Sequence, residues 1–107
     1  MARVHKRKSA KRDLIAQWVW FAETAGIETA DRFLAAADAT ASMLASQPEA
    51  GVRVSALTKS AQRGMRRFPI TNGFDSILLF YVPLRNGIDL VRVLHGSRDL
   101  AGLFSEE

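Results

Sequence analysis

Residues 76–95 read SILLFYVPLRNGIDLVRVLH, and this stretch predicts two strands joined by a short turn. Ser76–Val82 is apolar on both faces, which is typical of a central strand that is covered on both sides. Arg85-Asn86-Gly87 has the composition of a turn. Ile88–His95 then predicts a last strand, which Gly96 ends. We therefore expect an antiparallel strand pair at the centre of a sheet.

The chain before this pair predicts a further strand and two helices. Met65–Ile70 is expected to be a strand, and the hairpin signal Asn72-Gly73 connects it to the central pair. Apolar residues recur at spacings of three and four from about residue 10 to 25 and again over about Glu28–Ser46, which predicts two amphipathic helices. Gly26 separates them, so we expect an antiparallel helical hairpin.

The predicted fold class is α+β, with an N-terminal antiparallel helical hairpin packed on a three- to four-stranded antiparallel sheet. Residues 2–7 are a possible additional strand at an edge of that sheet. Ser9 is expected to cap the first helix, and Asp13 to favour the dipole of its first turns. The length of 107 residues suits a single domain over 1–107.

One helical layer covers only one face of a sheet. Ile77, Leu79 and Tyr81 alternate with Leu78, Phe80 and Val82, so apolar side chains are expected on both faces. The second face is then covered either by the 51–64 connection and the C-terminal tail or by a protein partner. Tyr81 is expected in the core, and Trp18 and Trp20 in the core and between packed helices.

Composition excludes several classes of function. There is no cysteine, which rules out disulfides and thiolate metal sites, and two histidines make a zinc site improbable, so we expect no metal and no cofactor. A basic N-terminus followed by Leu14–Ala22 resembles a secretion signal, but Asp13 and Gln17 interrupt the apolar part. No stretch approaches the ~20 apolar residues that span a bilayer. We therefore expect a cytoplasmic protein that does not contact a membrane.

The net charge of +4 is concentrated in two segments that contain no acidic residue. Surfaces of this kind attract phosphate backbones and acidic proteins alike, and they also serve as ordinary solvated surface. The first segment, within residues 1–12, holds Arg3, Lys6, Arg7, Lys8, Lys11 and Arg12. The second, within 51–74, holds Arg53, Lys59, Arg63, Arg66 and Arg67.

Four motifs point to one family. Gly87–Leu100 reads GIDLVRVLHGSRDL and closely resembles the end of ParE-type toxins of the RelE/ParE superfamily, where a glycine turn precedes a strand ending in R-V-L-H-G-x-R-D. Gly64–Ile70 (GMRRFPI) is similar to the family's G-L-R-x-F-P-V strand, and Phe80-Tyr81 to its I-F-Y strand. Pro48 and Gly51 fit its P-x-x-G. The resemblance covers nearly the whole chain in order.

This resemblance implies the toxin of a type II toxin–antitoxin system. ParE-type toxins poison DNA gyrase, and a cognate antitoxin encoded beside the toxin neutralises it by wrapping an extended, partly helical segment around it. RelE-type relatives share the fold but cut messenger RNA in the ribosome. We therefore expect an antitoxin and DNA gyrase as partners, with no direct sequence-specific binding of nucleic acid, and a toxin that is not an enzyme.

The nuclease alternative requires a base, an acid and a cation around the scissile phosphate. Arg66 or Arg67 would supply the cation, and His95 the acid–base group. Where nuclease relatives carry an arginine at the start of the middle strand, this chain has Asp75-Ser76, and a carboxylate there repels phosphate. The set is incomplete, so the mRNA endonuclease is the alternative. A member that retains only antitoxin binding is a third possibility.

Surface residues near the last strand are the expected contacts with antitoxin or target. His95 is also explained as a structural hydrogen-bonding residue at a strand end. Arg92 lies in an apolar strand and must reach a carboxylate, either Asp89 or Asp75 in this chain or one on the antitoxin. The expected contact residues are Arg66, Arg67, Arg92, His95 and Arg98.

Overall fold

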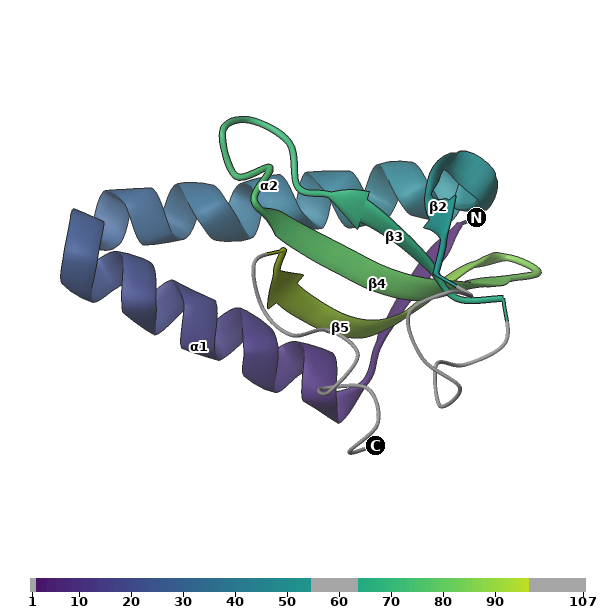
Figure 1. Ribbon diagram of the computed structural model, residues 1–107, viewed down its shortest axis with the longest axis horizontal. Coiled ribbons are helices and arrows are strands. Elements are labelled where there is room, and N and C mark those ends of the chain that lie inside the picture. The colour runs from purple at the N-terminus through teal and green to yellow at the C-terminus, as the bar shows by residue number, and fades with distance from the viewer. Residues whose placement is uncertain (1, 55–63, 97–107) are drawn as a thin grey trace.

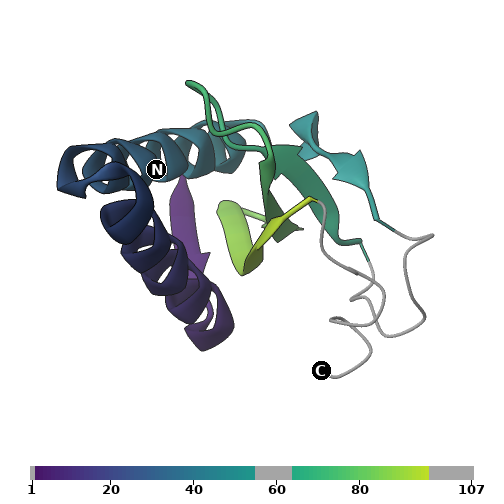
Figure 2. The same cartoon turned by 60° about the vertical axis from the view of Figure 1, so that its left-hand side comes forward.

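The structure, a computed structural model, describes residues 2–54 and 64–96 and consists of a helical hairpin packed on a mixed sheet (Figure 1). The helices are α1 (Lys8–Ala25) and α2 (Ile27–Ser46), and a short 3-10 turn, η1, spans Pro48–Ala50. The strands are β1 (Arg3–Lys6), β2 (Val52–Arg53), β3 (Arg66–Pro69), β4 (Ile77–Leu84) and β5 (Gly87–His95). Both helices lie on the same side of the sheet (Figure 2).

The sheet has five strands in the order β1-β5-β4-β3-β2. β4 is the central strand, and it pairs in antiparallel fashion with β5 on one side and with β3 on the other. The predicted α+β fold is confirmed with two differences. β1 adds at the edge of β5 in parallel, with Val4 opposite Ile88, so the sheet is mixed rather than antiparallel. A two-residue β2 extends the other edge. Neither short strand carries an apolar alternation long enough to predict its pairing.

The helical hairpin closes at Gly26, whose φ of 98° is a backbone conformation that side chains rarely adopt. This one residue both ends α1 and precedes α2, as expected. The indole nitrogen of Trp18 donates to Asp31 at 3.0 Å and ties the two helices together. The expectation that Trp20 is also buried is wrong, since it is 56% exposed.

The main core lies between the helices and one face of the sheet. Phe33 and Leu44 of α2 are fully buried against Leu79 and Tyr81 of β4, so the expected burial of Tyr81 is confirmed. Phe33 also makes an edge contact with Phe74, with ring centroids 5.7 Å apart. Small alanines on α2 let the helix approach the sheet closely.

A second apolar cluster occupies the opposite face of the sheet. Phe80 is fully buried there together with Val91 and Leu94, which confirms that β4 is apolar on both sides. The 51–64 connection contributes Val54 to this cluster, and Met65, which directly follows the connection, is buried there too. The middle of that connection and the C-terminal tail, 97–107, lie outside the described residues.

Side chains of α1 cover the part of the β5 edge that lies beyond β1. The Ser9 hydroxyl donates to the carbonyl of Val91 at 2.7 Å, and the backbone N–H of Val93 donates to Asp13 at 2.9 Å. The expected capping role of Ser9 is therefore wrong: α1 begins at Lys8, one residue before it. An exposed strand edge is thus closed by a helix.

Asp13 also binds the guanidinium of Arg92, with Oδ2 2.7 Å from Nε and Oδ1 3.1 Å from Nη2. The expectation that Asp89 or Asp75 would be the intramolecular partner of Arg92 is wrong. Both side chains are about 15% exposed, so this ion pair is largely removed from water. A bidentate pair of this kind fixes orientation as well as contributing energy.

Replacing Asp13 with alanine should destabilise the protein by about 3 kcal/mol, because it leaves a largely buried guanidinium and a backbone N–H without their acceptor. The measurement is urea-induced unfolding followed by circular dichroism. The matched control is Asp75→Ala, an exposed carboxylate, which should change stability by less than about 0.5 kcal/mol. Equal stabilities of the two variants would contradict the structural role of Asp13.

Candidate functional site

Arg66 and Tyr81 lie together and hold the turn between α2 and β2. Arg66 donates to the carbonyl oxygens of Gly51 at 2.7 Å and Glu49 at 3.2 Å. The Tyr81 hydroxyl donates to Pro48 O at 2.7 Å and accepts from Gly51 N at 2.9 Å. Burial raises the pKa of Tyr81 above its usual value, against smaller opposing effects of the Gly51 hydrogen bond and the Arg66 charge.

Gly51 is required by this arrangement for space rather than for its backbone angle. A Cβ at position 51 would overlap the Tyr81 hydroxyl and approach the carbonyl oxygen of Arg67 to 2.7 Å. The P-x-x-G pattern of Pro48 and Gly51 therefore marks the place where η1 packs on the tyrosine. Arg66 and Tyr81 are both engaged with backbone groups here.

The structure does not bring together the three residues considered for nuclease chemistry. His95 pairs with Ile77 at one end of β4, whereas Arg66 pairs with Tyr81 four residues along the same strand. That separation is about 13 Å at the usual rise of a strand. Arg67 is opposite Phe80, whose side chain belongs to the cluster on the other face of the sheet. A phosphate bound beside His95 would therefore be remote from both arginines.

Of the remaining expected contact residues, Arg92 is placed against Asp13, and Arg98 lies outside the described residues. Asp75, the departure from the nuclease pattern, is exposed in the turn between β3 and β4. Ser76 beside it accepts a hydrogen bond from Gly96 N at 2.7 Å, which closes the end of β5 onto the start of β4.

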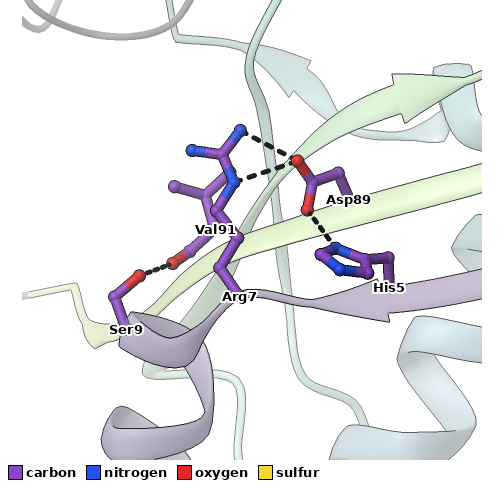
Figure 3. Close-up of polar contacts among 5 residues, drawn as sticks. All are labelled: His5, Arg7, Ser9, Asp89 and Val91. Atoms are coloured by element: carbon purple, nitrogen blue, oxygen red, sulfur yellow. Dashed lines mark hydrogen bonds and ion pairs between the residues drawn. The ribbon is translucent and has the colours of Figure 1, made fainter.

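A polar cluster that sequence analysis did not identify joins β1, β5 and the start of α1 (Figure 3). Asp89 accepts from His5 at 3.0 Å and from Arg7 Nε at 2.9 Å. Burial would raise the pKa of Asp89, but the hydrogen bonds and charges of Arg7 and His5 outweigh it and hold that pKa below its ordinary value. Residues 84 positions apart have no pattern that predicts such a contact.

His95 lies at a hollow of about 700 Å³ between the closed end of the helical hairpin and the turn from β3 to β4. Aromatic rings form part of its wall: Phe21 packs against Trp20 and Phe74, with ring centroids 5.1 and 5.3 Å apart. Arg32 of α2 belongs to the lining, and its Nη2 donates to the Thr29 hydroxyl at 3.2 Å. The described lining residues are Gln17, Trp20, Phe21, Thr29, Arg32, Asn72, Gly73, Phe74, Ser76, Ile77 and His95.

The described residues contain neither a group of metal-binding side chains nor a helix suited to a membrane. Across residues 2–54 and 64–96, no three His, Asp or Glu side chains are grouped as metal ligands would be. In the same part of the chain, neither helix combines the length and the apolar character needed to cross a bilayer.

Comparison with known proteins decides the family. The sequence model of the "ParE toxin of type II toxin-antitoxin system, parDE" matches residues 4–100, which is most of the chain. This chain belongs to the ParE toxin family. The match includes β1 and both helices as well as the C-terminal motif, so the resemblance found in the sequence is confirmed. No curated protein sequence matches the chain.

The fold of this ParE-family toxin also recurs in a solved structure. A chain of the "Chromosomal ParDE TA system from P. aeruginosa" superposes with a TM-score of 0.67 and 16% sequence identity. The alignment covers 89% of this toxin and 96% of that chain. At such low identity the likeness shows a shared fold, with the helical hairpin and sheet in the same arrangement.

The Asp89 cluster makes the stability of the toxin depend on pH in a defined direction. Because the pKa of Asp89 is lower in the folded state than in the unfolded chain, its contribution is complete above about pH 4 and is lost as the pH falls through the folded pKa. We expect Asp89→Asn to be less stable than the wild type at pH 6, with the difference shrinking in acid. Urea unfolding from pH 2.5 to 7 measures this.

Arg7→Gln is the matched variant, because Arg7 lowers the pKa of Asp89 more than His5 does. Without Arg7 the folded-state pKa of Asp89 lies closer to that of the unfolded chain, so the stability lost in acid should be smaller than in the wild type. A difference between wild type and Asp89→Asn that stays constant across the whole pH range would contradict this account of the cluster.

Proposed function

We propose that this toxin inhibits DNA gyrase by binding, without catalysing a reaction itself, and that a cognate antitoxin encoded beside it holds it inactive. Membership of the ParE family across residues 4–100 carries the proposal. Gyrase acts on the chromosome, so the toxin would work in the cytoplasm. No cofactor and no metal enter this mechanism.

The placement of the charged side chains supports binding rather than phosphate cleavage. Arg66 donates to two backbone carbonyls and Arg92 to Asp13, so both guanidinium groups stabilise the fold. His95 and Arg67 lie on opposite faces of the sheet. Cleavage of RNA needs an acid–base group and a cation around one phosphate, and the described residues do not place these candidates around one point.

The basic N-terminal segment supplies surface for a macromolecular partner. It is folded as β1 and the first turns of α1, where Lys8, Lys11 and Arg12 are exposed at helical spacing on one side. Lys6 and Arg7 are instead paired with Asp38 and Asp89. Exposed cations of this kind increase the rate of encounter with acidic proteins and nucleoprotein complexes.

Purified toxin should inhibit gyrase while leaving translation unaffected. The assay combines gyrase, plasmid DNA and ATP, and a coupled translation reaction runs beside it. We expect lost supercoiling or accumulated cleaved plasmid, and an effect that weakens with added salt. Heat-denatured toxin is the control.

Normal gyrase activity with arrested translation and cut messenger RNA would instead assign the protein to the ribosome-dependent endonucleases. If both reactions proceed normally while the antitoxin still binds, the chain is a member that retains antitoxin binding alone. Each of these two outcomes contradicts the proposed inhibition of gyrase.

The antitoxin should raise the thermal stability of the toxin, because a ligand that binds only the folded state stabilises it. The probe is the purified product of the reading frame that adjoins the toxin gene. At a concentration 100-fold above Kd, the expected stabilisation is about 2.7 kcal/mol. An unchanged melting temperature at that excess would contradict the proposed partner.

A further inference from the structure

A small pocket at the β1 edge of the sheet is lined by basic and amide side chains. β1 contributes Arg3 and His5, and the turn between β4 and β5 contributes Arg85 and Asn86. The described lining contains no carboxylate, and it shares no residue with the hollow beside His95. This edge pocket has a volume of about 430 Å³ and is lined by Arg3, Val4, His5, Leu84, Arg85 and Asn86.

The edge pocket depends on the close approach of β1 to the turn that carries Arg85. The backbone N–H of Arg3 donates to the carbonyl of Asn86 at 2.7 Å, and Arg3 is the register partner of Gly87. A Cβ at position 87 would overlap the carbonyl oxygen of Arg3, and the φ of 150° there is one that side chains rarely adopt. Glycine at position 87 therefore allows the two arginines to line one pocket.

The guanidinium groups of Arg3 and Arg85 are available to a ligand. Both side chains are exposed, and neither makes an ion pair within residues 2–54 and 64–96. Two like charges beside one pocket repel each other, so an anion bound between them is favoured. A planar guanidinium presents paired N–H donors that match the oxygens of a phosphate, and Asn86 adds an amide donor.

The carboxylates near the edge pocket are directed to other groups. Asp89 is bound by Arg7 at 2.8 Å (Figure 3), and Asp38 by Lys6 at 3.3 Å. Glu49 is exposed, but it lines an adjacent hollow beside the end of β4 rather than the edge pocket. The positive charge of the two arginines is therefore not neutralised by a described side chain in the lining.

Further exposed cations follow at the other end of β1. Lys8 and Arg12 are exposed and lie one helical turn apart at the start of α1. β1 is an edge strand about 10 Å long at the usual rise, so cations flank it at both ends. One strand of a DNA duplex carries a phosphate every 3.4 Å or so along the helix axis. This spread of charge favours an extended polyanion over a single small anion.

We propose that the edge pocket binds a backbone phosphate of DNA between Arg3 and Arg85, and that Lys8 and Arg12 contact phosphates further along the same strand. Contacts of this kind read no bases, so the binding is independent of sequence. The inference rests on the proposed function, because a toxin bound to gyrase lies beside the DNA that gyrase holds. It adds a direct DNA contact to a toxin whose proposed partners are proteins.

The test measures binding of a short fluorescein-labelled DNA duplex to the toxin alone, by fluorescence anisotropy over a series of salt concentrations. The double variant Arg3→Gln/Arg85→Gln should bind about tenfold more weakly, because charge-assisted hydrogen bonds to a phosphate are lost. Its plot of log affinity against log salt should be shallower by about 0.9, the value for one phosphate contact. Duplexes of unrelated sequence should bind the wild type equally well.

The matched control is Arg32→Gln/Arg53→Gln, which removes the same net charge from two other exposed arginines. Arg53 is on β2 at the opposite edge of the sheet, and Arg32 lines the hollow beside His95. This variant should bind the duplex within about twofold of the wild type, because charges remote from the DNA are screened. Circular dichroism and melting temperatures establish that every variant is folded.

Two competitors distinguish DNA from other anions. Neither ATP nor polyglutamate, each added at the same total charge as the labelled duplex, should displace it. Displacement by ATP would assign the edge pocket to a small phosphate ligand, and displacement by polyglutamate would assign it to an acidic protein. Either result would overturn the DNA contact, as would equal losses of affinity in the two double variants.

The gyrase assay separates failure of this inference from failure of the proposed function. Inhibition of gyrase by a toxin whose DNA affinity does not depend on Arg3 and Arg85 would overturn the edge pocket alone. DNA binding that does depend on the two arginines, in a toxin that leaves gyrase active, would support the pocket and contradict the proposed inhibition.

Discussion

The carboxylate of Asp13 is the contact on which the arrangement of helices and sheet depends. β5 is nine residues long, but β1 pairs only with Gly87–Leu90. The backbone N–H and C=O groups along the rest of that edge therefore need other hydrogen-bond partners. Asp13 accepts the N–H of Val93 and the guanidinium of Arg92 with the same two oxygens. A helix side chain thus continues the edge pairing where the strand stops.

This anchor also determines where the rest of α1 lies. Ser9 binds the carbonyl of Val91, so two points one turn apart fix the start of the helix against β5. Trp20 follows Asp13 by seven residues, which is about 10.5 Å along the axis and close to the same side of the helix. The position of Trp20 at the hollow is therefore a consequence of contacts made two turns earlier.

The irregularity between β4 and β5 shifts the alternation of faces along β5, so that Leu90 and Val93, three positions apart, both pack in the main core. The pairing shifts between Phe80 and Tyr81, so that Phe80 faces Arg92 and Tyr81 faces Leu90. Val91 lies between these two partners and packs in the second cluster, whereas Leu90 packs in the main core. A bulge of this kind changes which face successive residues meet.

The sequence predicted those elements whose apolar spacing is long and regular. The two helices, the hairpin at Gly26 and the three antiparallel strands all follow from local periodicity. The parallel pairing of β1 could not be predicted, because four residues with one half-buried valine carry no register information. The partner of Arg92 was missed for a related reason: Asp13 is 79 residues away, and helical spacing gives no sign that its side chain crosses to a strand.

The same limit applies to the candidate site. Trp18 and Trp20 differ by two positions on one helix, and only the placement of α2 makes Trp18 a contact between the helices and leaves Trp20 exposed. The hollow is lined by residues of α1, α2, the turn after β3 and the end of β5, so no single stretch of sequence predicts it. His95 was identified from the sequence because a motif contained it, whereas Arg32 belongs to no motif.

The arginines of the two family motifs both hold parts of the fold together. Arg66 of GMRRFPI holds the turn at Gly51, and Arg92 of RVLHG holds α1 against β5. Each guanidinium makes more than one hydrogen bond within the fold and is at least partly buried. The arginines that are exposed lie elsewhere: Arg12 and Arg32 on the helices, and Arg3, Arg53 and Arg85 on the edge strands and the turn between β4 and β5.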